Sequence, residues 1–223
     1  MKAECFTLGF CVSIAQRSGR ISSIVAYRKQ SDKKTKKGGM YEMNARDLGY
    51  IAVSTAFLSV SAWVAVPVGG IPITLQILVL CLSAVLLGAK RGTLATLAYL
   101  LLGLVGVPVF AGFTGGVGVL LSPTGGYLVG FLPLSLLVGL AGEKLLERKN
   151  GKLLLGLYMG AGVSLCYATG TVWFVVLMAQ NSARVGLWSA LLTCTLPYLP
   201  FDVVKIFIAV LSTQKLRKII KIK

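Results

Sequence analysis

Apolar residues dominate the chain from about residue 48 to residue 214, in long runs separated by short polar breaks or by breaks rich in glycine and proline. A run of about 20 apolar residues is the length that an α-helix needs to cross a membrane. The runs predict membrane spans at residues 48–66, 72–88, 92–107, 126–142 and 153–179, and a last span that ends near residue 214. The pattern therefore predicts an all-α integral membrane protein with six transmembrane helices.

The last apolar stretch, residues 184–214, is interrupted by Pro197 and Pro200. It forms either one kinked helix or a re-entrant piece followed by a helix, and we favour the second arrangement. Pro200 suits the first turn of a helix, where its missing N–H group has no intrahelical partner to lose. Asp202 then lies in the same turn, where the helix dipole stabilises an anion.

Residues 1–43 differ from the rest, because a short apolar patch at 5–15 precedes a basic polar segment. The patch is consistent with a signal peptide, but cleavage there would leave basic residues outside the membrane, against the positive-inside rule. A disordered or targeting extension is a second interpretation. We favour a third, in which translation starts at Met40 or Met43 and the membrane domain comprises residues 44–223.

Composition agrees with a membrane protein. Hydrophobic residues make up 56% of the chain and the mean hydropathy is +0.81, whereas a soluble domain is about 45–50% apolar. The net charge of +16 does not indicate nucleic acid, because the basic residues lie before the first span, in alternate loops and at the C-terminus. The other loops hold only Arg184. We therefore predict a multi-pass protein of the cell membrane with both termini in the cytoplasm and with Trp63 and Trp188 near the outer interface.

Several kinds of chemistry are excluded by what the sequence lacks. It has no histidine, no phosphate-binding glycine loop and no carboxylate cluster that could hold a metal. Its five cysteines lack CxxC spacing and fit buried apolar positions. We predict neither an enzyme nor a protein that needs a cofactor, so energy for uphill transport must come from a partner or an ion gradient.

Asp202 and Lys205 lie inside the last apolar run. Ionisable residues are costly there and mark a functional site by default. Three positions apart on a helix, their side chains share one face and can offer a carboxylate and a cation to a small polar ligand. The alternative is that they only neutralise each other and fix the helix in register. Because a buried ion pair seldom adds net stability, we favour the ligand site.

The segment 108–127 is rich in glycine, which permits close approach of the backbone to a ligand. Irregular backbone at membrane depth must be buried in protein or line a cavity. The alternative is a long surface connection. Four apolar residues in the segment, Val109, Phe110, Phe113 and Val117, favour a lid that packs on a pocket.

Five strings together resemble one family in their order and spacing. They are IPITLQ (71–76), GAKRG (88–92), AYLLLGLVGVPVFAGFTGG (98–116), SPTGGYLVGF (122–131) and LPFDVVKI (199–206). The family is BioY, the biotin-binding S components of energy-coupling-factor (ECF) vitamin transporters. The resemblance covers about residues 44–214 and implies an S-component bundle of six helices, with a biotin site near the outer face. Phe201 departs from the pattern, since the family has glycine before the aspartate, and would tighten the pocket wall or alter the backbone.

The resemblance also implies which residues bind biotin. Asp202 and Lys205 match the two ligand-binding residues of the last helix. The same strings contain further positions that we predict to bind the ligand: Gln76, Phe110, Gly125 and Tyr127.

Ala52 and Ala56 lie one helical turn apart, and small residues at this spacing let another helix approach closely. Taken alone, such a pair more commonly serves packing within the same chain. They match the face that the family uses to dock a membrane coupling subunit, so the resemblance implies this subunit and cytoplasmic ATPases as partners. Whether dedicated ATPases are used stays open. Alternative functions are an S component or stand-alone carrier for another small vitamin, and a membrane scaffold in which Asp202 and Lys205 only hold helices together.

Overall fold

The computed structural model describes residues 43–68, 71–145, 151–180, 188 and 195–219. The chain divides into two units, Met1–Asn44 and Ala45–Lys223, and the described elements belong to the second. The N-terminal segment 1–42 and most of 181–194 lie outside the described residues. The alternatives for the extension and for the stretch before the last helix therefore stay open.

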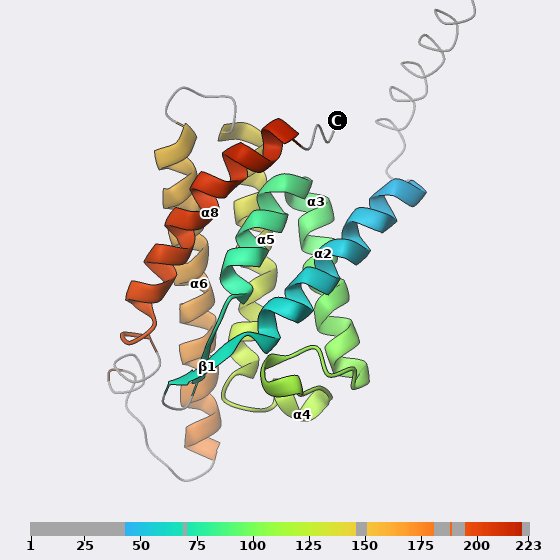
Figure 1. The fold of residues 1–223 in the computed structure, drawn as a ribbon. Helices are drawn as coiled ribbons and strands as arrows, with labels where there is room; N and C mark the ends of the chain where they lie inside the picture. The colour runs from blue at the N-terminus through green and yellow to red at the C-terminus, as the bar shows by residue number, and fades with distance from the viewer. Residues whose placement is uncertain (1–42, 69–70, 146–150, 181–187, 189–194, 220–223) are drawn as a thin grey trace, which may run out of the picture. The chain divides into compact units, whose positions relative to one another are not determined.

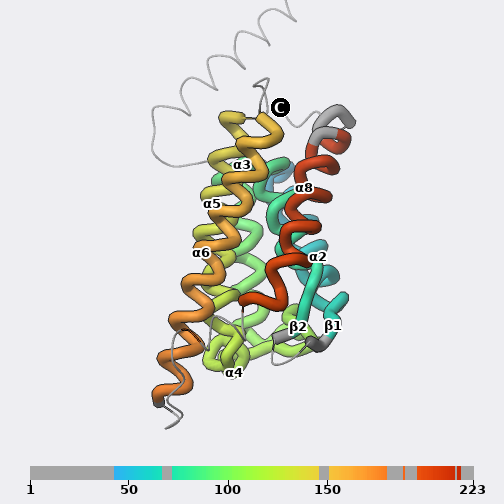
Figure 2. Tube along the Cα trace, turned by 90° about the vertical axis from the view of Figure 1, so that its left-hand side faces the viewer, coloured from blue at the N-terminus to red at the C-terminus, as the bar shows by residue number. Residues whose placement is uncertain are grey.

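The second unit is mainly helical (Figure 1). Its described elements are α2 (Ala45–Trp63), β1 (Ala65–Val68), β2 (Ile71–Thr74), α3 (Gln76–Val105), the 3-10 turn η1 (Ala111–Phe113), α4 (Val117–Leu120), α5 (Gly125–Leu145), α6 (Gly151–Gln180) and α8 (Leu199–Ile219). Helix α3 packs on α2, α5 and α8, and α6 packs on α5 and α8. Both views place the two strands and α4 at the same end of the bundle (Figures 1 and 2). Among the described helices, α5, α6 and the 30 residues of α3 taken together are long and apolar enough to cross a membrane.

Helix α3 is two antiparallel arms that meet at Gly88. The backbone there has φ 81° and ψ 175°, a region that only glycine populates readily. Gln76 Nε2 donates a hydrogen bond of 2.6 Å to the Tyr99 hydroxyl, although residues 76 and 99 of a straight helix would lie about 35 Å apart. The spans predicted at 72–88 and 92–107 are therefore these two arms. The break predicted between the two spans is confirmed, and a single residue, Gly88, makes the turn.

A β-hairpin takes the place of the helix ends that the apolar runs predict within residues 65–74. Strands β1 and β2 pair antiparallel, with Ala65 opposite Thr74. Helix α2 thus ends at Trp63 instead of continuing to residue 66, and the first arm of α3 begins at Gln76 instead of residue 72. Proline has no N–H group for an i−4 bond, so Pro67 disfavours helix, and the valine, isoleucine and threonine of the strands favour pairing. The fold is therefore not purely α.

The glycine-rich segment packs on the bundle through its first half. Val109 and Phe110 are buried, and the Phe110 ring occupies the space beside Gly103, where an added Cβ would lie 2.0 Å from the ring. The chain doubles back at a bridge between Phe110 and Thr114, which leaves Phe113 and Val117 exposed. Of the four apolar residues expected to face a pocket, only the first two are buried.

Charged side chains meet at the end of the bundle that carries the Gly88 turn. Arg91 Nη2 lies 2.9 Å from Asp47 Oδ1, which joins α3 to the start of α2. The Glu143 carboxylate near the end of α5 accepts a 2.9 Å hydrogen bond from the Ala89 N–H group and so caps the second arm of α3. One end of the bundle is thus charged, and the other carries the β-hairpin and the glycine-rich segment.

Replacing Gly88 by alanine is expected to lower the free energy of unfolding by about 1–3 kcal/mol, because a Cβ is strained at this backbone conformation. The added Cβ would also lie 2.5 Å from Glu143 Oε1. Equilibrium unfolding in detergent measures the loss. The matched control is Gly49→Ala in α2, where an added Cβ meets no atom within 4 Å and stability should hold or rise by about 0.5–1 kcal/mol. Equal behaviour of the two variants would contradict the role of Gly88.

Candidate ligand-binding site

A cavity of about 390 Å³ lies beside β2, η1 and α4, whose residues form part of its wall. Its wall is built from β2, the first arm of α3, the glycine-rich segment, α5, α6 and α8. Most of the wall is apolar, with Ile77, Phe131 and Val163 among the lining residues. Its volume and its few polar groups are typical of sites for small molecules.

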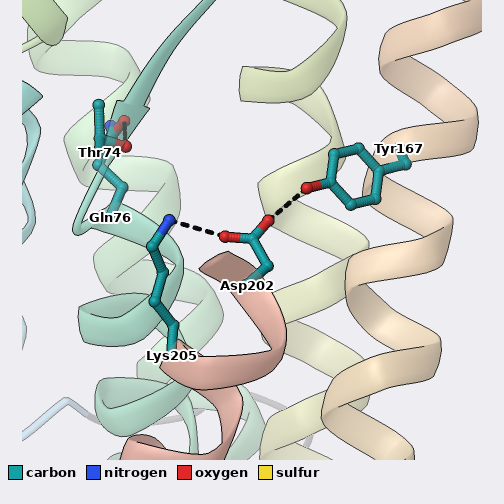
Figure 3. A network of polar contacts seen from close by, with 5 residues as sticks. All are labelled: Thr74, Gln76, Tyr167, Asp202 and Lys205. Atoms are coloured by element: carbon teal, nitrogen blue, oxygen red, sulfur yellow. Dashed lines mark hydrogen bonds and ion pairs between the residues drawn. The ribbon is translucent and has the colours of Figure 1, made fainter. Parts of the chain in front are cut away.

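Asp202 and Lys205 both line this cavity from the first turns of α8. Pro200 lies in the first turn of α8, as expected, and the Asp202 N–H group donates to the Tyr198 carbonyl at 3.0 Å. Lys205 Nζ lies 2.7 Å from Asp202 Oδ1 (Figure 3). The two residues are only 3% and 8% exposed. Water therefore screens the Coulombic attraction between the two charges only weakly.

Tyr167 of α6 completes this group and is not among the residues predicted from the sequence. Its hydroxyl donates to Asp202 Oδ2 from the side opposite Lys205 (Figure 3). The Asp202 carboxylate therefore has one donor on each oxygen. Since a buried phenol hydroxyl usually has a hydrogen-bond partner, a tyrosine in the middle of an apolar span was the signal that could have identified it.

Hydrogen bonds also tie the wall that holds Gln76. Thr74 donates to Gln76 Oε1 at 2.9 Å, Gln76 donates to Tyr99, and the Tyr99 hydroxyl donates to the Val109 carbonyl at 3.2 Å. This chain of bonds joins β2, both arms of α3 and the glycine-rich segment. It fixes the Gln76 amide, which lines the cavity with Thr74 (Figure 3).

Of the three remaining residues predicted to bind the ligand, two line the cavity and one does not. Phe110 and Tyr127 line the same cavity as Asp202 and Lys205. Gly125 is not among the lining residues, and an added Cβ there would lie 1.7 Å from the Leu120 carbonyl oxygen. Gly125 therefore has a packing role, because it lets the start of α5 pass close to α4. Phe201 is 52% exposed and does not line the cavity, so it does not tighten the pocket wall.

The position of Asp202 and Lys205 on one helix bears on whether they join helices or bind a ligand. Asp202 and Lys205 belong to one helix, so their ion pair cannot join two helices; the contact with α6 is made by Tyr167. Lys205 has three N–H donors, and among the described residues one of them bonds to Asp202. The ammonium group can therefore donate to a ligand carboxylate or carbonyl while it stays bound to Asp202.

Away from the cavity, Ala52 and Ala56 are exposed on α2. They lie on one face of that helix, one turn apart. The structure thus separates the two predicted surfaces: the ligand-binding residues enclose a cavity, whereas the two alanines lie on the outside of the bundle.

We expect Tyr167→Phe to lower the free energy of unfolding by about 1.5–3 kcal/mol, because the buried Asp202 carboxylate loses one of its donors. Equilibrium unfolding in detergent measures this loss. Tyr158→Phe is the matched control, since Tyr158 lies on the same helix and is 44% exposed. Unfolding curves that shift equally in the two variants would show that the hydroxyl contributes nothing at Asp202.

Comparisons with known proteins agree with this architecture. A model of the BioY family matches residues 32–222. The biotin transporter BioY of Thermotoga maritima is 38% identical over 174 residues, which cover 78% of this chain and 97% of that protein. A probable biotin transporter BioY of Pyrococcus horikoshii is 34% identical, and the match covers 78% of this chain and 98% of that protein.

A solved structure shares the fold. The crystal structure of the S-component for biotin from an ECF-type ABC transporter superposes with a TM-score of 0.70 at 30% identity, and the match covers 79% of this chain and 95% of that one. The relatives are transporters, and this chain has several helices able to cross a membrane. This chain is a multi-pass membrane protein and belongs to the BioY family.

Proposed function

We propose that this chain binds biotin and serves in its uptake across the cell membrane, as the S component of an ECF-type transporter. The observation that carries the proposal is the buried group of Asp202, Lys205 and Tyr167 at a mainly apolar cavity. Relatives that match over nearly their whole length are named biotin transporters, which supports biotin over other small vitamins.

Biotin suits the chemistry of this cavity. Its carboxylate is the proposed partner of the Lys205 amine, which keeps Asp202 as a counter-ion. Its ureido group needs donors and acceptors, and the polar residues of the wall, such as Thr74, Gln76 and Ser122, supply both. Its ring and aliphatic chain suit the apolar side chains of Phe110 and Phe131.

The proposed topology is six spans with both termini in the cytoplasm. Positive residues favour the cytoplasmic side, and the bundle end with Arg91 and Lys144 is opposite the end with the cavity. In this orientation the cavity opens toward the exterior, where biotin is taken up.

The proposed partners are a membrane coupling subunit and cytoplasmic ATPases. No phosphate-binding loop is present in the sequence, so energy must come from elsewhere. The side chains of Ala52 and Ala56 on the exposed face of α2 are small enough for a partner helix to approach closely. We assign this face to the coupling subunit.

Lys205→Met is expected to lower biotin affinity at least tenfold, because the ligand carboxylate loses a charge-assisted hydrogen bond of about 1.5–3 kcal/mol. Equilibrium binding of radiolabelled biotin to the purified protein measures this effect. Lys215→Met is the matched control, since Lys215 is exposed on the same helix. Asp202→Asn should do less harm if Asp202 only orients Lys205, and comparable harm if it accepts from the ureido N–H groups. Unchanged affinity in folded Lys205→Met would remove the site assignment.

The double variant Ala52→Leu with Ala56→Leu is expected to abolish biotin uptake by cells and to leave biotin binding nearly unchanged. Leucine at both positions would block the close approach of a partner helix. Because both alanines are exposed, the larger side chains should not overfill the bundle. Uptake and equilibrium binding are measured on the same variant, and parallel loss of both would contradict a docking role.

A further inference from the structure

The segment of residues 108–114, which we call the lid, forms part of the cavity wall. Phe110, Ala111 and Thr114 line the cavity directly. The lid is attached to the bundle on two sides, one facing the interior and one facing outward. The two attachments differ in burial and in backbone strain, so they differ in how readily they can open.

The inner attachment is buried. The Val109 carbonyl accepts from the Tyr99 hydroxyl at 3.2 Å, and the Phe110 ring meets Tyr99 edge to face with centroids 5.4 Å apart. Phe110 is 1% exposed and occupies the notch at Gly103. Opening this side would expose a large apolar ring and break a buried hydrogen bond, which makes it the more stable attachment.

The outer attachment is a clasp of Trp63 and Phe113. Trp63 Nε1 donates to the Pro108 carbonyl at 2.9 Å, and the two rings stack with centroids 4.9 Å apart. Both side chains are more than one third exposed, and neither lines the cavity. The clasp therefore holds the lid without touching a bound ligand.

Phe113 adds strain to this clasp. Its φ of 58° places a bulky side chain in the left-handed region, which such residues rarely adopt. The stacking on Trp63 favours this conformation, and opening the clasp would relieve the strain. The lid is thus held by two contacts. The outer one, between Trp63 and Phe113, is exposed and under backbone strain, whereas the inner one, at Val109 and Phe110, is buried and unstrained.

We infer that the Trp63–Phe113 clasp is a releasable fastening that sets how fast ligand enters and leaves the cavity. The inference rests on the proposed function, in which the ligand is biotin. Because the clasp touches the lid and not the cavity, it stabilises the closed lid equally with and without ligand. Weakening the clasp should therefore raise the association and dissociation rates by the same factor and leave the equilibrium affinity unchanged.

The test uses the purified full-length chain and radiolabelled biotin. Trp63→Ala is expected to raise both rates about tenfold, since it removes a ring contact and a hydrogen bond, while Kd stays within about threefold. Trp63→Phe keeps a ring and should give a smaller increase. Phe113→Ala combined with Trp63→Ala should act no more strongly than Trp63→Ala alone, because Trp63→Ala already removes the ring contact that the two residues share. Val117→Ala, an exposed residue of α4 that does not line the cavity, is the control.

Hydrogen exchange of the ligand-free chain provides a second readout. The Gly116 N–H group, which lies just after the lid, donates to the Gly103 carbonyl of α3, so its exchange reports separation of the lid from the bundle. Exchange should be about tenfold faster in Trp63→Ala than in the wild type or Val117→Ala.

Unchanged rates and unchanged exchange would overturn the inference. A rise in dissociation alone, with weaker Kd, would also overturn it, since the clasp would then belong to the binding site. If the wild type binds no biotin but Trp63→Ala still exchanges faster, the proposed function is refuted, whereas the role of the clasp in closing the lid is supported.

Discussion

The interaction on which the site depends is the burial of the Asp202 carboxylate in an apolar helix bundle. A carboxylate in such surroundings is tolerated only with partners. Lys205 supplies the opposite charge from the same helix, and Tyr167 supplies a hydroxyl from α6. The position of Asp202 in the first turn of α8 adds the favourable field of the helix dipole. The requirement to satisfy one charge therefore brings α6 and α8 together beside the cavity.

The space for the cavity follows from the short first arm of α3. Residues 76–87 rise by about 18 Å as a helix, which is less than the roughly 30 Å of a bilayer core. The β-hairpin and the lid lie at the end of the bundle that this arm does not reach (Figure 1). Paired strands and hydrogen bonds from Tyr99 and Trp63 satisfy much of this irregular backbone. The site is thus placed where helical packing gives way to other backbone arrangements.

Helix α2 connects features at both ends of the bundle. It begins beside the ion pair between Asp47 and Arg91 and ends at Trp63, which contacts the lid. Its exposed alanines lie between these points. Under the proposed function, the surface that meets the coupling subunit and the residue that fastens the lid belong to one rigid element.

The sequence determined the features that depend on local spacing. Apolar runs identified the main helices, Pro200 marked the start of α8, and the three-residue spacing placed Asp202 and Lys205 on one face. Tertiary structure decided the features that depend on contacts between distant residues or on backbone pairing. Tyr167 meets Asp202 across 35 positions of sequence, and no local period encodes such a contact. The β-hairpin replaced the helix ends that hydropathy alone predicts, because hydropathy does not distinguish a buried strand from a buried helix. The placement of Gly125 also depended on the folded backbone, because the turn after α4 brings the Leu120 carbonyl to the position that a Cβ at residue 125 would occupy.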